Sequence, residues 1–314
     1  MARALTIPPV FDPFVPGEAE AAWPILAELR RQGPVAAVAH GMQYVTRHAE
    51  CVGVLRDSER FSNASGFKAP GVEIPEEDRL LGELDPPKHT RVRRIMVTAL
   101  APKLVRAAEP FMEETARALL TALPVGAADL VERYTVPLPN RITVHLLGFD
   151  PGDADQLARW AKELMESTFP STNRTEPGIG FAAAFPEFAN YIDGHIDTRA
   201  AQLERGHDLD DVLARLLKLD IDGEHLPRRQ VRALVRNLIT GGLTTTSQLL
   251  GNLLHAVLTD PGLDAMRSDD NALPTLSLQS FRDQPLAVMH LAVIEAVRIG
   301  SVDELDAELI DCML

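Results

Sequence analysis

The chain has 314 residues, of which 46% are hydrophobic and 24% charged, and its formal net charge is −14. These values are typical of a globular protein that buries a substantial core, as one large domain or two ordinary ones. The acidic balance argues against a general nucleic-acid binder, and two cysteines cannot form a disulfide framework or a structural zinc site.

Targeting and membrane signals are missing from the sequence. The first residues lack the apolar core of a signal peptide, and no run approaches 18 uninterrupted apolar residues. We therefore expect a cytoplasmic protein with no membrane span.

The first 62 residues mix short extended segments with helices. Residues 7–17 are rich in proline, which fixes φ and predicts an extended arm. A helix follows through Trp23, and residues 35–46 predict a short hairpin. Helical spacing returns over residues 48–55, so this part is predicted to be a small mixed unit.

Residues 84–94 spell L-D-P-P-K-H-T-R-V-R-R. Asp85 and the two prolines predict a helix start, and His89 and Arg93 are four apart, so they share one face. Both side chains carry N–H donors, so together they could hydrogen-bond carboxylates. The alternative is that they simply belong to an exposed, basic helix start. The following basic residues predict either a patch for an acidic partner or a solvated helix face: Arg91, Arg94, Lys103 and Arg106.

Helical periodicity dominates the middle of the chain. It predicts helices over residues 110–123 and over about 153–167 and 181–204, and residues 136–148 are expected to begin another helix between them. His145 falls in an apolar helix, which favours a buried core residue over a ligand.

Residues 227–260 predict one long helix that crosses the domain. Its centre, G-G-L-T-T-T over residues 241–246, is a poor helix sequence, because each glycine costs about 1 kcal/mol relative to alanine. Missing side chains let a ligand approach the backbone, and threonine hydroxyls can hydrogen-bond a ligand or their own helix. A helix–helix crossing packed through the glycines is the alternative.

Several strings resemble the bacterial, soluble cytochromes P-450, a family of haem-thiolate monooxygenases. Gly241-Gly242-Leu243-Thr244-Thr245 is similar to the oxygen-groove motif A/G-G-x-D/E-T. D-P-P-x-H-T-x-x-R resembles the helix that binds the haem propionates, and P-L-P near residue 137 matches a further family segment. No hydrolase, Walker, dinucleotide-binding or zincin motif competes with this match.

The resemblance covers nearly the whole chain. It implies a mainly α fold with small β-sheets, in one domain over residues 1–314 that is incomplete at its C-terminus. We expect an N-terminal β-lobe over about 1–62, a helical lobe over about 63–285 and a short β segment over about 286–314. The Gly/Pro-rich residues 169–181 would be the substrate lid.

The resemblance also implies site residues. His89 and Arg93 would donate to the haem propionates, and Gly241 and Gly242 would let haem and oxygen approach the helix. Thr245 would hydrogen-bond dioxygen. Thr244 stands where the family has an acid, and a neutral hydroxyl relays protons less well than a carboxylate.

The C-terminal part departs from the family pattern. Gln279 and Arg282 take the positions of the structural E-x-x-R pair, so the charge-assisted bidentate contact is lost; Glu295 to Arg298 also spells that motif. The family's propionate-binding arginine falls here on His290 or Leu291.

The chain ends at Leu314, before the family's cysteine-ligand loop. Cys312 has no glycine-rich loop around it, and Cys51 is predicted to be buried core. We therefore assign no residue as a metal ligand.

Three functional hypotheses follow. The first is a haem monooxygenase of secondary metabolism that takes electrons from a ferredoxin-type donor and hydroxylates a small apolar substrate; lacking the ligand loop, this chain is expected to be inactive. The second is a haem-free P-450-like accessory protein that activates a partner enzyme such as a glycosyltransferase, and the third is a gene remnant. Retained His89 and Arg93 favour the first over the second.

Overall fold

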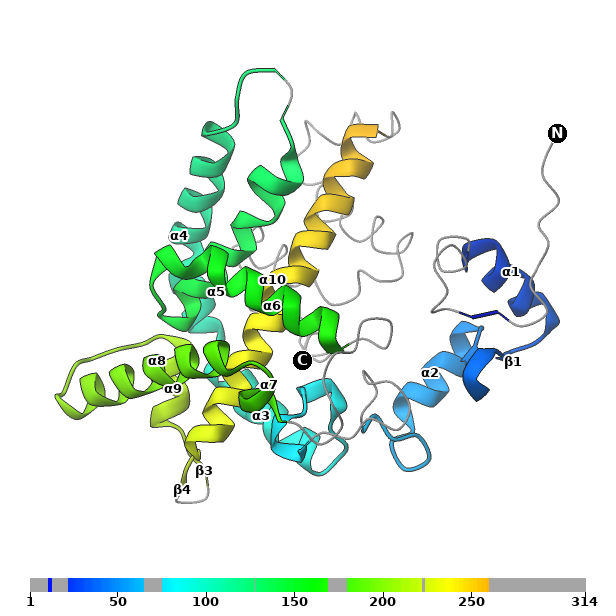
Figure 1. The fold of residues 1–314 in the computed structure, drawn as a ribbon, viewed down its shortest axis with the longest axis horizontal. Coiled ribbons are helices and arrows are strands. Elements are labelled where there is room, and N and C mark those ends of the chain that lie inside the picture. The colour runs from blue at the N-terminus through cyan, green and yellow to red at the C-terminus, as the bar shows by residue number, and fades with distance from the viewer. Residues whose placement is uncertain are drawn as a thin grey trace.

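The computed structural model of the chain describes residues 11–12, 22–64, 75–126, 128–168, 180–221 and 224–259. Helices make up most of these residues, and the two sheets among them have two strands each (Figure 1). The predicted class, mainly α with small β-sheets, is confirmed. No helix in the described ranges combines the length and apolar character needed to cross a membrane.

The first lobe contains α1 (Ala22–Gln32), β1 (Val35–Ala37), the 3-10 turn η1 (Ala39–Gly41), β2 (Gln43–Val45) and α2 (His48–Arg56). The strands pair antiparallel, so the predicted hairpin and its flanking helices are confirmed. Gly41 has φ +71°, a conformation that favours glycine at the turn. A small core holds this lobe together: Phe11, Ile25, Leu29 and Val38.

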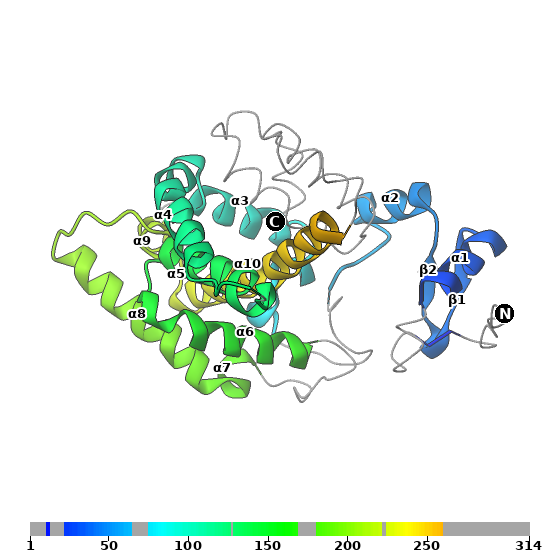
Figure 2. The same cartoon turned by 90° about the horizontal axis from the view of Figure 1, so that it is seen from above.

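The helical lobe follows. Its elements are η2 (Glu76–Asp78), η3 (Leu81–Glu83), α3 (Lys88–Ala99), α4 (Pro102–Thr121), the π-helical turn η4 (Val131–Thr135), α5 (Pro137–Leu147), η5 (Pro151–Asp153), α6 (Ala154–Thr168), α7 (Phe181–Ala184), α8 (Pro186–Glu204), α9 (Val212–Lys218), β3 (Asp220–Ile221), β4 (Glu224–His225) and α10 (Arg228–Thr259). The lobe lies to one side of α1 and the hairpin (Figures 1 and 2).

Prolines explain two differences from the predicted boundaries. The helix expected to begin at residue 110 begins at Pro102, and Pro110 lies inside it. Pro102 occupies the first turn, where a missing N–H costs nothing. The helix expected over 181–204 is interrupted at Phe185, whose φ of −132° and ψ of 64° are not helical. The residue before a proline is disfavoured in the helical region, and Pro186 therefore starts a new helix.

α5 begins within the predicted segment and ends at Gly148, which adopts the left-handed conformation with φ 74°. The prediction for His145 was wrong, because its side chain is exposed. Helical spacing puts Val144 and Leu147 in the core and leaves His145 on the outer side. There it stacks on Phe111, with ring centroids 3.8 Å apart. Partial burial lowers the pKa of His145.

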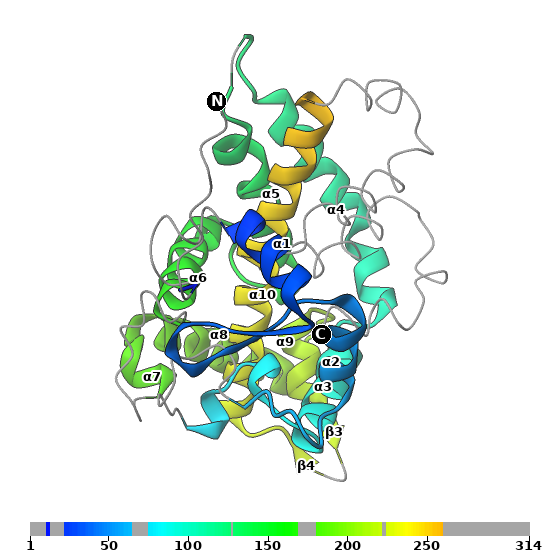
Figure 3. The ribbon, with the colours of Figure 1, turned by 90° about the vertical axis from the view of Figure 1, so that its right-hand side faces the viewer.

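α10 is the central helix, and it runs the length of the helical lobe (Figures 1 and 3). It packs on α5, α6, α8, α9, η2 and η4. The predicted helix over residues 227–260 is thus confirmed within one residue at each end. Its buried residues join those of α3, α5, α6, α8 and α9 in one continuous core, and the largest fully buried side chains include Phe188, Leu213, Leu234 and Ile239.

Candidate functional site

The two central glycines of α10 have different surroundings. A Cβ atom on Gly242 would lie 2.9 Å from Thr143 Oγ1 of α5, so Gly242 serves a close helix–helix crossing. A Cβ on Gly241 would meet nothing within 4 Å among the described residues. The packing reading of the motif is therefore confirmed for Gly242, which packs against α5. Among the described residues nothing fills the space beside Gly241, so ligand approach stays a prediction for that glycine.

The hydroxyls that follow are bonded to their own helix. Thr245 Oγ1 donates to the carbonyl oxygen of Gly241, and Ser247 Oγ donates to that of Leu243 at 2.7 Å. Such bonds back to the preceding turn satisfy a side-chain hydroxyl inside a helix. Thr244 and Thr245 are partly exposed, whereas Thr246 is buried. The structure thus presents Thr244 and Thr245 on an accessible side of α10, close to Gly241.

His89 and Arg93 lie on α3, one turn apart, and both are partly exposed. The opposite face of α3 is buried in the main core through Val92, Ile95, Met96 and Ala99. Burial lowers the pKa of His89, and the charge of Arg93 lowers it further, while Asp85 acts in the opposite direction. At neutral pH His89 is therefore a neutral imidazole that donates one hydrogen bond.

Asp85 does not cap α3, contrary to the prediction. Pro87 holds the cap position without a side-chain bond. The Asp85 carboxylate instead accepts from the hydroxyl of Ser62 and, at 2.7 Å, from the backbone N–H of Asn63. These contacts, with that of Ser62 first, lower the pKa of Asp85. Asp85 therefore ties the end of the first lobe to the start of α3.

The remaining predicted residues fall largely outside the described part of the chain. Gln279, Arg282, Cys312, the alternatives His290 and Leu291, and all but the last two residues of the expected lid, 169–181, belong to this group. Cys51 is described, and it is partly exposed rather than buried, with its thiol 3.3 Å from the carbonyl oxygen of Val45.

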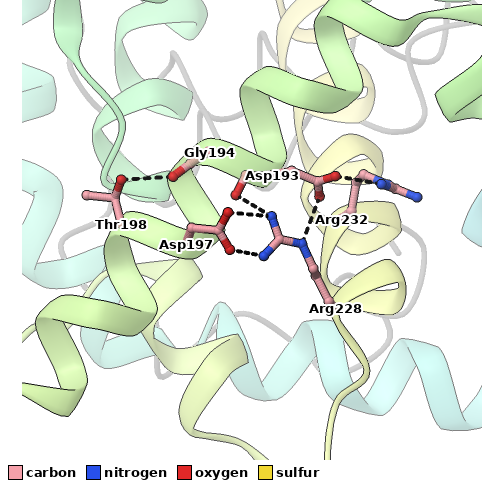
Figure 4. Close-up of polar contacts among 6 residues, drawn as sticks. All are labelled: Asp193, Gly194, Asp197, Thr198, Arg228 and Arg232. Carbon is pink, nitrogen blue, oxygen red and sulfur yellow. Dashed lines mark hydrogen bonds and ion pairs between the residues drawn. The ribbon is translucent and has the colours of Figure 1, made fainter.

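Sequence reasoning missed the arginines of α10. Arg228 pairs with Asp197 and Asp193 of α8, and Arg232 Nη1 lies 2.7 Å from Asp193 Oδ2 (Figure 4). Arg236, a further turn along, is buried at 2% exposure. The available signal was the i, i+4, i+8 spacing of Arg228, Arg232 and Arg236, which places the three side chains along one side of the helix.

The described residues fit a haem on two counts. His89 and Arg93 form a donor pair suited to the two carboxylates of haem, and the backbone beside Gly241 is open to a flat ligand. Within the described ranges, no three His, Cys, Asp or Glu side chains are grouped to hold a metal ion by themselves. α3 and α10 are parts of one core, since α9 packs on both helices.

Comparison with known proteins identifies relatives of the chain, although no family model matches it. It is 29% identical over 261 residues to the erythromycin C-12 hydroxylase of Saccharopolyspora erythraea, covering 83% of this chain and 64% of that protein. It is 31% identical over 297 residues to the 6-deoxyerythronolide B hydroxylase of the same organism, covering 88% and 70%.

Solved structures give the same result. A mutant of P-450 EryK in complex with erythromycin B matches with a TM-score of 0.73 and 28% identity, over 86% of this chain and 68% of that one. The ligand-free cytochrome P-450 TbtJ1 matches with a TM-score of 0.68 and 29% identity, over 84% and 66%. The chain belongs to the bacterial cytochrome P-450 family. It spans about two thirds of the length of the curated relatives that it matches.

Proposed function

We propose that the chain binds haem through α3 and the middle of α10 and serves the hydroxylation of a small, largely apolar substrate. The observation that carries this proposal is the open backbone at Gly241, one turn before Thr245 in the central helix. Family membership supports the same reaction class, because the relatives include hydroxylases. The haem, when bound, supplies the activation of dioxygen.

The chain's own residues hold the cofactor and handle a proton. Arg93 and the neutral His89 would each donate to a propionate, which fixes the haem edge by charge-assisted hydrogen bonds. Thr245 holds its proton toward the Gly241 carbonyl and can turn it toward dioxygen on the open side of the helix. Thr244 adds a neutral hydroxyl where relatives in the family use an acid, so we expect slow proton delivery.

An acidic electron donor of the ferredoxin type fits the outer face of α3. Arg91, Arg94 and Lys103 are exposed on α3 and on the first turn of α4. Complementary charge speeds the encounter of such partners. This assignment predicts an electron-transfer rate that falls steeply as ionic strength rises.

The test is an absorption spectrum of the purified full chain supplied with haem, before and after reduction under carbon monoxide. We expect a Soret band in the wild-type protein and its loss in Arg93→Ala, with Arg91→Ala on the same helix as the matched control. Full haem retention in Arg93→Ala would contradict the propionate assignment. A folded, soluble wild-type chain without any haem band would favour the accessory-protein hypothesis.

A further inference from the structure

Arg236 is a buried charge with long-range partners. Its Nη2 donates to the carbonyl oxygen of Asp78 at 2.7 Å, across 158 positions of sequence. Its Nη1 lies 4.0 Å from Asp78 Oδ1, and its guanidinium carbon lies 4.9 Å from the ring centroid of Phe181. The Arg236 side chain therefore contacts η2 and the first residue of α7 at the same time.

Asp78 also contacts the start of α7 directly. Its Oδ2 accepts the backbone N–H of Phe181 at 3.0 Å. A Cβ atom on Gly180 would lie 2.3 Å from that oxygen, so the contact requires glycine at this position. Because Gly180 has φ −77°, the requirement comes from close approach and not from backbone conformation.

The segment that begins at Asp78 continues into α3, the helix that carries His89 and Arg93. Glu83 is fully buried, and its carboxylate accepts the N–H of Leu80 at 2.9 Å. Leu81 and Leu84 belong to the main core, and α3 begins four residues after Leu84. Residues 78–84 therefore form a short, rigid link between Arg236 on α10 and the donor pair His89 and Arg93 on α3.

We propose that Arg236 is a positioning residue: through Asp78 it fixes the 78–84 link and the start of α7 against α10. In this way it sets the spacing between the propionate donors of α3 and the open Gly241 backbone. We call this contact set, Arg236, Asp78, Gly180 and Phe181, the α10 clamp. The assignment of its effect on haem rests on the proposed function, whereas the clamp itself does not.

Stability alone would not test the α10 clamp. Burial lowers the pKa of Arg236 to about 10, and Asp78 and Glu83 oppose that shift, so the guanidinium remains charged at neutral pH. Burying a charge is costly and pairing it offsets the cost, so the net contribution of a buried pair to stability can take either sign. The decisive readouts are therefore haem affinity and local hydrogen exchange.

The first experiment is haem titration of the full chain followed by the Soret band. Arg236→Gln should weaken haem affinity by about 10-fold, a typical effect of removing a residue that orients cofactor ligands. Arg232→Gln is the matched control, because Arg232 is one turn away on α10 and pairs with α8 instead (Figure 4). Arg236→Lys, which keeps the charge and one donor, should recover part of the affinity.

The second experiment measures amide hydrogen exchange at Phe181. Exchange should accelerate in Arg236→Gln and in Gly180→Ala, whose methyl group displaces the Asp78 carboxylate, and should stay unchanged in Arg232→Gln. Unchanged exchange in both clamp variants would overturn the clamp, and unchanged haem affinity in Arg236→Gln would overturn the positioning role. If the wild-type chain takes up no haem, the proposed function fails, while accelerated exchange in the two clamp variants still supports the clamp.

Discussion

The first half of α10 and its middle differ in how many long-range partners their side chains contact. From Arg228 to Thr240 the helix is held by long-range partners. Arg228 and Arg232 pair with α8 (Figure 4), and Arg236 contacts η2 and α7. From Gly241 to Thr246 the side chains are small except for Leu243, which is buried in the main core, and the hydroxyl of Thr245 bonds its own helix. The first half thus fixes the helix in the molecule, and the middle leaves one side of a fixed backbone accessible.

If the proposed haem site is correct, this difference separates stability from function along one helix. Ion pairs and buried aliphatic groups hold a helix against its neighbours, but they also fill the space around it. A ligand-binding face needs small side chains, which contribute little packing. Because the packed first half and the middle belong to one helix, the first half holds the backbone of the middle in place.

The largest contrast should come from truncating one residue in each part. Ile239 is fully buried, so Ile239→Ala should lower the free energy of unfolding by about 3 kcal/mol, through lost burial and a residual cavity. Thr245→Ala should change it by less than about 1 kcal/mol, since alanine is the better helix former and replaces a partly exposed side chain. Urea unfolding of both variants measures this contrast, and equal losses would contradict it.

A smaller contrast is expected between the two glycines. Gly242→Ala should destabilise the haem-free chain by about 1–2 kcal/mol, because the new methyl group overlaps Thr143 Oγ1. Gly241→Ala should stabilise it by up to about 1 kcal/mol, because no described atom lies within 4 Å of the new methyl group and alanine favours helix.

A double-mutant cycle checks the cause of the Gly242 effect. Combined with Thr143→Ala, which removes the overlapping oxygen, Gly242→Ala should lose most of its cost. A cost that persists in the Thr143→Ala background would mean that the α5 crossing does not select glycine at position 242.

The smallest expected effect is that of acid on α8, the helix that pairs with the first half of α10. His195 lies on α8 and stacks on Phe149, with centroids 4.2 Å apart. Burial lowers its pKa from 6.5, Arg199 adds to that effect, and the nearby carboxylates of Asp153 and Asp150 oppose it. At His195 the unfolded chain therefore binds a proton at a higher pH than the folded chain does, so this residue's contribution to stability falls as pH drops below about 6.5.

His195→Asn should accordingly flatten the decline in unfolding free energy between pH 7 and pH 5. Chemical denaturation at several pH values measures the slope, with the exposed His207→Asn as the control. An unchanged slope in His195→Asn would assign the acid sensitivity to other groups.

Local features of the molecule could be predicted from the sequence. The long α10, the start of α5 within residues 136–148 and the hairpin between residues 35 and 46 follow from periodicity, capping and turn residues, which act over a few positions. Helical spacing also placed His89 and Arg93 on one face of α3. The pattern of two glycines and three threonines predicted either helix packing or ligand approach, and the structure confirms packing at Gly242.

Only the tertiary structure decided between partners that are far apart in sequence. It showed that Gly242 meets Thr143 while Gly241 stays open, that Asp85 binds Ser62 and Asn63 instead of capping α3, and that His145 faces outward. It also joined Arg236 to Asp78 across 158 positions. Helix propensity and periodicity carry no information about which distant segment covers a given face. That choice is made when the whole core packs, and it determines which of two adjacent glycines is packed against a neighbouring helix.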